Sequence, residues 1–533
     1  MVANSNENSV HLDEVLKKFG AFNRYNIRAV LLISFVFFTN NMHCINYIIV
    51  AEETPYRCKI DKCESESNVF QQPWYNFTAP LDSRGCNRYS EINEECSETG
   101  FNTSLVETCD DWVYKRDDSF VAEFKLACQD WKRTFVGTVH SIGMMSGLLF
   151  QGQLSDKIGR KAAVIIGGVA ALVFGVAKSF ANSYVVYIIL EWFEATFGDN
   201  CSPAFIMGVE LMHGDYRLHQ QIFFCFVATL GGVAFAVAAY LVPYWRHFVR
   251  VIYAPALLFI LYYFIMDESV RWLLSKGKRE DATNLLLKMA KVNKIALDEK
   301  TIVNIKCEEN KVESSALRET FRSKIVIKRF LICLVWWTSC TFIAFGLIVN
   351  VGFLAGNKYL NIGIMSLSDI PASIAMVFIL KRYKRKKPLL ISFISAGLLC
   401  LVQPFVPKQY VWMSTGIYFL GRFVSTFTFT TVYVYTSELF PTYSRNSMHA
   451  LCSAIGRIGS ILAPMTPLLT VYMESLPTLL FGGISVLAGL TTMLVPDLAN
   501  EPLPDNVQQA ENIGTYQLTI TTNKEVEENC KTL

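Results

Sequence analysis

The sequence GQLSDKIGRK, residues 152–161, joins two apolar segments, 134–154 and 161–180. Gly152 and Gly159 allow the backbone to turn tightly there. Asp156 precedes Arg160 by four residues, a spacing at which a carboxylate and a guanidinium can pair. The stretch therefore predicts a short turn between two helices, held by an ion pair that can break when the helices move.

Apolar segments of similar length recur on both sides of this turn. A helix needs about twenty apolar residues to cross a bilayer. The charged fraction of 18% is below the roughly one quarter usual in soluble proteins. We therefore predict an all-α membrane protein of twelve helices in two six-helix halves, 27–266 and 330–496. Beyond the two segments above, the predicted helices cover 27–50, 184–209, 220–242, 246–266, 330–350, 359–380, 388–406, 410–436, 447–470 and 477–496.

Basic residues gather in the connections on one side of the predicted bundle. They occur at 157–161, at 381–387 and at Arg445. By the positive-inside rule this side is cytoplasmic, and the run 381–387 could also bind lipid headgroups. Both termini, 1–26 and 497–533, and the central loop, 267–329, then lie on the same side. The loop is predicted to hold an amphipathic helix, and the tail 497–533 to be disordered.

A polar insert, residues 51–133, follows the first predicted helix and falls on the opposite, extracellular side. It carries 17 acidic and 10 basic residues. It contains two glycosylation sequons, at Asn76 and Asn102. An even number of cysteines in an extracellular segment predicts a disulfide framework, for which fifteen connectivities are open. The six candidates are Cys58, Cys63, Cys86, Cys96, Cys109 and Cys128.

The full spacing of 152–161 resembles the loop signature of the major facilitator superfamily. Four further segments resemble solute carrier family 22, the organic cation, organic anion and carnitine transporters. They are 20–26 (GAFNRYN), 54–58 (TPYRC), 268–274 (ESVRWLL) and 438–446 (ELFPTYSRN). The sequence departs from that family at Lys381 and Lys384, where Asp and Gly are usual, and at Glu191 and Glu194, where many relatives carry Arg and Gln.

The resemblance implies transport by alternating access, in which the two halves rock around a central site. No Gly-rich nucleotide-binding loop is present, so the energy source is expected to be a solute gradient, an exchanged solute or a coupled ion. The net charge of +3 and the absence of a recognisable motif argue against nucleic-acid binding. We expect no enzyme activity, no cofactor and no metal site, because the seven histidines are scattered. The expected gating residues are Gly152, Asp156, Gly159, Arg160, Glu210, Glu438 and Arg445.

Ionisable residues within membrane helices normally face protein or water. Arg457 lies between small residues in the segment 447–470, and the resemblance implies that an arginine there serves anions and carnitine. With Asp369 it could hold a zwitterion, or the two could neutralise each other. Trp337 and, more weakly, Phe345 are candidate aromatic contacts, although most membrane tryptophans pack or anchor.

These observations predict a multi-pass plasma-membrane transporter of small organic anions or zwitterions, such as carnitine-like or amino-acid-derived molecules. An organic cation carrier is the alternative, because Asp369 and Trp337 would suit a cation. A transporter-like receptor that binds without moving its solute is a third possibility, favoured by the altered loop at 381–387.

Overall fold

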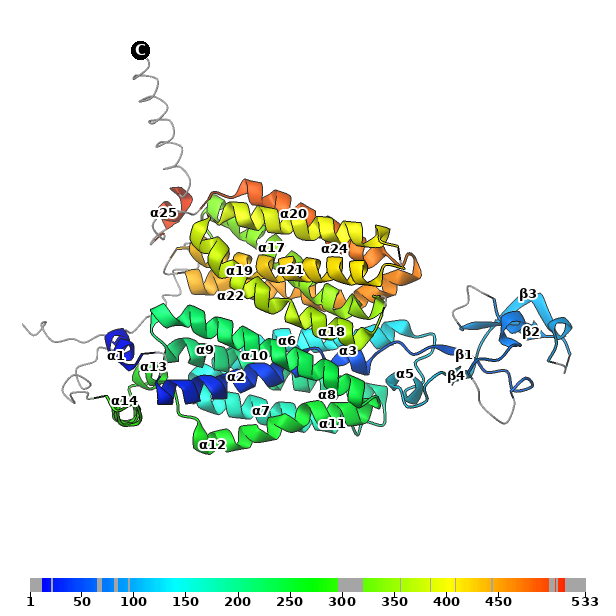
Figure 1. Ribbon diagram of the computed structural model, residues 1–533, viewed down its shortest axis with the longest axis horizontal. Helices are drawn as coiled ribbons and strands as arrows, with labels where there is room; N and C mark the ends of the chain where they lie inside the picture. The colour runs from blue at the N-terminus through cyan, green and yellow to red at the C-terminus, as the bar shows by residue number, and fades with distance from the viewer. Residues whose placement is uncertain are drawn as a thin grey trace, which may run out of the picture.

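The computed structural model describes most of the chain (Figure 1), and every structural statement below concerns the described residues. They are 12–20, 23–64, 70–80, 85–93, 96–295, 320–354, 356–383, 385–407, 409–441, 444–497, 504 and 507–512. Lys384 therefore lies outside the described residues.

The first half contains six helical spans. They are α2 (Arg24–Cys44) continued by α3 (Asn46–Val50), α6 (Asp130–Ile158), α7 (Arg160–Lys178), α8 (Tyr184–Phe197) with α9 (Cys201–Leu211), α10 (Gly214–Leu241), and α11 (Trp245–Tyr253) with η2 (Ala254–Leu261) and α12 (Tyr262–Ile265).

The second half also contains six helical spans. Its spans are α17 (Lys324–Val349), α18 (Lys358–Leu367) with α19 (Asp369–Arg382), α20 (Lys386–Val402), α21 (Val411–Leu439), α22 (Arg445–Gly456) with α23 (Ile458–Leu462) and η5 (Ala463–Val471), and α24 (Leu476–Thr491). The short 3-10 segments η3 (Asn350–Phe353), η4 (Gln403–Phe405) and η6 (Thr492–Leu494) end α17, α20 and α24. The predicted twelve-helix fold is confirmed.

Nine of these spans are long and apolar enough to cross a membrane by length and composition. The other three are α6, α8 with α9, and α21. Each of them carries ionisable side chains toward its middle, such as His140, Glu191 and Arg422. Such groups are costly next to lipid and normally mark a polar interior.

The two halves lie side by side (Figure 1), with the first half in blue to green and the second in yellow-green to orange. One seam joins α6 to α23 and η5, where Thr138 Oγ1 donates to the Ile461 carbonyl at 3.3 Å. The other joins α10 to α18 and α19, where the rings of Tyr240 and Tyr359 pack 5.7 Å apart. Both contacts lie toward the end of the bundle that carries the insert, which we call the insert end.

The insert forms two small antiparallel sheets, which the prediction of an all-α chain did not include. Strand β1 (Tyr56–Cys58) pairs with β4 (Trp112–Tyr114), and β2 (Asn87–Glu91) pairs with β3 (Phe101–Thr108). The short helices α4 (Tyr75–Thr78), η1 (Glu98–Gly100) and α5 (Phe120–Glu123) complete it. Strands with unpaired edges are possible here because this segment stands outside the helical bundle (Figure 1). Three disulfides join Cys58 to Cys109, Cys63 to Cys96 and Cys86 to Cys128.

Short helices pack at the opposite end of the bundle, which we call the loop end. There α1 (Leu12–Phe19), α13 (Val270–Ser275) and α14 (Arg279–Asn293) share one apolar cluster. In the tail, for which we expected no structure, α25 (Val507–Asn512) rests against the start of α17. Arg329 donates to the carbonyl of Ala510, which fixes this helix.

Candidate functional site

A cavity of about 160 Å³ lies between the two halves of the bundle. Helices α2, α6, α8 and α9 of the first half supply most of its wall, and the second half contributes Arg457. The lining residues are Asn40, His43, Cys44, His140, Met144, Leu148, Glu194, Ala195, Gly198, Asp199, Cys201, Ser202 and Arg457. A pocket made by both halves is suited to a solute whose access alternates between two sides.

Arg457 reaches this cavity because small residues beside it allow close helix packing. It lies at the junction of α22 and α23. A Cβ on Gly456 would lie 2.7 Å from Cβ of Trp337, and a Cβ on Gly459 would collide with the backbone of Thr338. The two glycines therefore bring α22 and α23 against α17 and position the Arg457 side chain in the cavity.

The Arg457 guanidinium is half-buried. Among the described residues, no carboxylate oxygen lies within 4.0 Å of it. A guanidinium offers paired donors that match a carboxylate in two parallel hydrogen bonds. Arg457 is therefore available to a ligand anion.

Carboxylates line the first-half wall of the same cavity. Asp199 accepts from Ser202 Oγ at 2.7 Å and from the Cys201 amide at 3.0 Å, so it caps the start of α9. Glu194 is 3% exposed and pairs with Lys178 Nζ at 3.4 Å. The two halves thus present opposite charges to the cavity.

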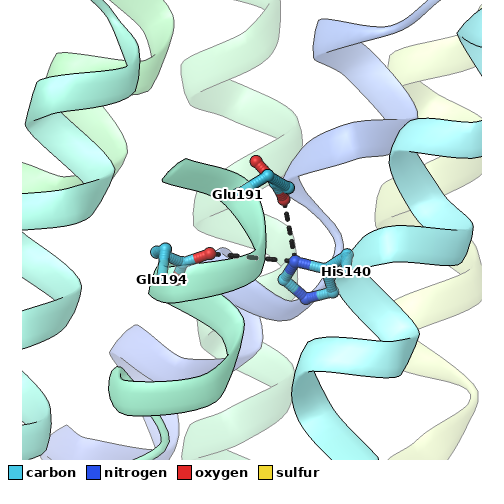
Figure 2. A group of neighbouring side chains, drawn as sticks. All are labelled: His140, Glu191 and Glu194. Carbon is cyan, nitrogen blue, oxygen red and sulfur yellow. Dashed lines mark hydrogen bonds and ion pairs between the residues drawn. The ribbon is translucent and has the colours of Figure 1, made fainter. Parts of the chain in front are cut away.

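Glu194 belongs to a buried group that joins three helices. Lys178 Nζ lies 2.7 Å from Glu191 Oε2, and His140 Nδ1 lies 2.8 Å from Glu191 Oε1 and 3.7 Å from Glu194 Oε2 (Figure 2). We call His140, Lys178, Glu191 and Glu194 the charge cluster. His140, Glu191 and Glu194 offer atoms within 4.8 Å of one another, a grouping that the spacing of these residues in the sequence does not indicate.

Asp369 is placed elsewhere and has different partners. Its carboxylate accepts from Thr426 Oγ1 at 2.7 Å and lies 3.3 Å from an Arg422 guanidinium nitrogen. It does not line the cavity described above. Sequence reasoning missed Arg422, although an arginine inside the predicted segment 410–436 signals a buried partner.

Trp337 is packed within the second half. Its side chain is 2% exposed, and Nε1 donates to Thr436 Oγ1 at 3.1 Å. Its ring contacts those of Tyr433 and His449. Phe345, two turns further along α17, is half-buried. Neither aromatic residue lines the cavity that holds Arg457.

The predicted turn 152–161 is confined to Gly159 in the structure, because α6 continues to Ile158 and α7 begins at Arg160. Charged residues on both sides of Gly159 form an ion-paired network at the loop end. Asp156 Oδ1 lies 2.5 Å from Arg160 Nη1, and Arg160 Nη2 reaches Glu210 Oε1 at 3.2 Å. Glu268 Oε1 accepts from the backbone amides of Arg160 and Lys161 at the start of α7. A carboxylate is favourable at a helix N-terminus.

The two glycines differ in position, because Gly159 lies between α6 and α7 whereas Gly152, which was expected in the turn, lies within α6. Gly159 has a φ of +107°, which other residues rarely adopt, and a Cβ there would collide with the Glu268 carboxylate. Gly152 has open space around it. The positive φ therefore explains the glycine at 159 but not the one at 152.

A second latch occupies the matching place in the other half. Arg385 Nε lies 3.2 Å from Glu438 Oε2, and Arg445 Nε donates to the Phe440 carbonyl at 3.4 Å. The family's usual Asp is replaced by Lys381, and here Glu438 supplies the carboxylate. An ion pair can thus form in this half despite the altered loop.

Replacing Glu438 by Gln removes the negative partner of Arg385 and is expected to lower the maximal rate of uptake a few-fold. The effect is modest because the pair is partly exposed, and such pairs contribute about 0.2–1 kcal/mol. The exchange Arg385→Glu with Glu438→Arg restores the pair in reverse and should recover part of the rate. Initial uptake rates normalised to surface protein give this measurement. An uptake rate unchanged by Glu438→Gln would show that the ion pair between Arg385 and Glu438 does not contribute to gating.

Known proteins of similar sequence are membrane transporters. Residues 82–505 match the family described as sugar (and other) transporter. The organic cation transporter protein of Drosophila melanogaster is 28% identical over 520 residues, covering 94% of this chain and 95% of that protein. Solute carrier family 22 member 3 of Mus musculus is 28% identical over 536 residues, with 95% and 96% covered. The organic cation/carnitine transporter 2 of Mus musculus is 26% identical over 529 residues, with 93% of each covered.

Solved structures share the fold at lower identity. The major facilitator superfamily proton:xylose symporter XylE bound to 6-bromo-6-deoxy-D-glucose aligns with a TM-score of 0.58 and 16% identity, covering 92% of this chain and all of that one. The inward open conformation of XylE from E. coli aligns with a TM-score of 0.57 and 15% identity, covering 90% and 98%. The chain is therefore a membrane transporter rather than an enzyme, and it belongs to the sugar (and other) transporter family within the major facilitator superfamily, with solute carrier family 22 transporters as its relatives.

Proposed function

We propose that this protein carries small organic anions or zwitterions across the plasma membrane by alternating access. The observation that supports this most directly is the Arg457 guanidinium, which lies in the cavity between the halves without a carboxylate partner among the described residues. A solute carboxylate would complete that pairing. The solute would move down its own gradient, or in exchange for another solute or a coupled ion.

The contacts between the halves suggest which side of the carrier is closed. Glu52 and Lys358, from different halves, form an ion pair at the insert end. Thr138 and Ile461 meet near the same end. The latches of Arg160 and Arg385 at the loop end each stay within one half. Closure at the insert end would leave the cavity to open toward the loop end.

We place the insert end outside the cell and both termini in the cytoplasm. The basic connections at the loop end support this orientation by the positive-inside rule. Asn76 is exposed and Asn102 is half-buried, so an extracellular insert could be glycosylated at Asn76 and at the edge of β3. The three disulfides of the insert also suit an oxidising compartment. Basic residues at 385–387 would then face the anionic inner leaflet.

An organic cation carrier remains the second candidate. The carboxylates of Glu194 and Asp199 line the cavity, and relatives are named as organic cation transporters. Against this, Glu194 is already paired with Lys178 and Asp199 caps α9. A cation in the cavity would also face the Arg457 guanidinium.

Uptake of three solutes by cells expressing the protein distinguishes these proposals. L-carnitine represents zwitterions, glutarate anions and tetraethylammonium cations. We expect saturable uptake of L-carnitine or glutarate, above that of untransfected cells, and slower uptake of tetraethylammonium. Uptake of tetraethylammonium alone would establish the cation carrier. Binding of a solute without any saturable uptake would instead indicate a receptor.

A further inference from the structure

The charge cluster contains one more acidic group than basic groups of fixed charge. Glu191 and Glu194 supply two carboxylates, and Lys178 supplies one ammonium. Glu191 and Lys178 are 0% exposed, and Glu194 and His140 are 3% exposed. An unbalanced charge buried this completely is strongly unfavourable, so such groups bind a counter-charge or change protonation.

The other residues around the two carboxylates do not supply that charge. Asn46 Nδ2, from α3, lies 3.5 Å from Glu191 Oε1. Tyr253, from α11, accepts from Lys178 at 3.1 Å and stacks on the His43 ring of α2. His43 Nε2 lies 3.1 Å from the Ile252 carbonyl oxygen, so its polar contact is to the backbone. The neighbouring polar groups are Asn46, Tyr47, Tyr187, Tyr253 and the Cys44 thiol, which contacts His140. The other ionisable groups that line the cavity are His43, Asp199, Cys201 and Arg457.

The geometry favours a proton over a metal ion as the missing charge. The ammonium of Lys178 already lies 2.7 Å from Glu191 and 3.4 Å from Glu194, so a metal ion held by the carboxylates would be strongly repelled. His140 Nδ1 lies between the carboxylates of Glu191 and Glu194 (Figure 2). A proton on this imidazole, or on Glu194, balances the cluster without any added ligand.

His140 and Glu194 also line the cavity that contains Arg457. While the site is empty, the positive Arg457 guanidinium in the same cavity offsets the excess negative charge of the cluster. A solute carboxylate that pairs with Arg457 cancels this effect and therefore favours proton uptake by the cluster, and by linkage a bound proton favours solute binding to the same degree.

We infer that the charge cluster takes up one proton together with the solute carboxylate, so that the protein is a proton symporter. This inference rests on the proposed function, because it requires a carboxylate solute at Arg457. The proton enters at His140 or Glu194 from one side of the membrane and leaves, with the solute, on the other. No covalent bond other than the one to this proton is made or broken.

Purified protein in liposomes tests the inference. The probe is radiolabelled L-carnitine, or glutarate where the wild type takes that up faster. The membrane potential is held at zero with valinomycin and equal potassium, and the outside is made one pH unit more acidic. One-to-one coupling then gives a tenfold accumulation of solute, because a proton ratio of ten drives it. With the variants His140→Gln and Glu194→Gln, the solute should only reach equal concentrations inside and outside the liposomes, while labelled solute still exchanges for unlabelled solute.

Two controls keep folding and proposed function separate from coupling. His247→Gln alters an exposed histidine at the insert end and should retain tenfold accumulation. Wild-type protein that exchanges solute but never accumulates it would overturn the proton inference and leave the proposed function intact. Full accumulation in both His140→Gln and Glu194→Gln would also overturn it. Wild-type liposomes without any exchange of either solute would refute the proposed function and the proton inference together.

A second measurement covers the case in which both variants fail to fold. Addition of excess solute to weakly buffered wild-type protein in detergent should remove about one proton per protein from solution, detected with a pH-indicator dye. Solute binding without proton uptake would contradict the inference regardless of how the variants behave.

Discussion

Replacing Arg457 by Ala is expected to reduce the uptake of a carboxylate solute by about 10- to 100-fold. Hydrogen bonds to charged groups contribute about 1.5–3 kcal/mol, which corresponds to a loss of this size. The guanidinium has no carboxylate partner among the described residues, so its removal should leave no buried charge unpaired. The measurement is initial uptake of L-carnitine or glutarate as a function of concentration, normalised to surface protein.

Arg457→Lys and Arg279→Ala are the matched variants. Lysine keeps the positive charge but loses the planar fork, so its uptake should fall between wild type and Arg457→Ala. Arg279 is exposed at the start of α14, and its replacement should leave uptake unchanged. Wild-type uptake of both solutes by Arg457→Ala would exclude the guanidinium from the binding site.

Replacing Lys178 by Met is expected to cause the largest loss of folded protein. It leaves Glu191 and Glu194 in a fully buried site without the ammonium that pairs with both. Breaking a buried pair by removing one partner costs about 3–5 kcal/mol. That is a large share of the 5–15 kcal/mol by which folded proteins are usually stable. The yield of monodisperse protein and its melting temperature in detergent measure this effect.

A second substitution should reverse much of that loss. Glu191→Gln removes one of the two carboxylates that pair with Lys178 while keeping the side-chain shape. The double variant Lys178→Met with Glu191→Gln should therefore melt at a higher temperature than Lys178→Met alone. A melting temperature for Lys178→Met equal to that of the wild type would show that the charge cluster does not form as described.

Features formed by neighbours in the sequence could be predicted. The apolar segments gave the twelve spans, because a helix in lipid must satisfy its own backbone and present apolar side chains. The turn 152–161 gave the pairing of Asp156 with Arg160, because the two residues are one helical turn apart. The small residues beside Arg457 were recognised in the sequence, but the close approach of α22 and α23 to α17 that they allow was not predicted.

Features formed by distant residues could not be predicted in this way. Lys178 and Glu191 are separated by 13 positions, and His140 and Glu191 by 51. Nothing in the spacing of these residues indicates that three helices bring them together. The available signal was two glutamates inside an apolar segment, which require a partner somewhere in the bundle. The strands of the insert were missed for a different reason. Strands β1 and β4 have only three residues each, and the longer strands β2 and β3 show no alternation of buried and exposed residues.

The pairing of Asp369 also illustrates the limit of sequence reasoning. Two ionisable residues in predicted helices, Asp369 and Arg457, suggested a common site. The structure instead pairs Asp369 with Arg422, which lies on α21. Arg422 and Arg457 lie on consecutive helical spans, and the packing of α19 against α21 decides which arginine pairs with Asp369.

The central claim is that Arg457 binds the carboxylate of the transported solute. A double-mutant cycle that changes both the arginine and the solute carboxylate tests it most directly. The two inhibitors of uptake are L-carnitine and carnitine carboxamide, in which a neutral amide replaces the carboxylate, and each is measured in wild type and Arg457→Gln. If the two groups pair, wild type should bind L-carnitine about 10- to 100-fold more tightly than the carboxamide, and Arg457→Gln should lose this preference. An equal preference in wild type and Arg457→Gln would contradict the account, because the carboxylate would then be recognised elsewhere.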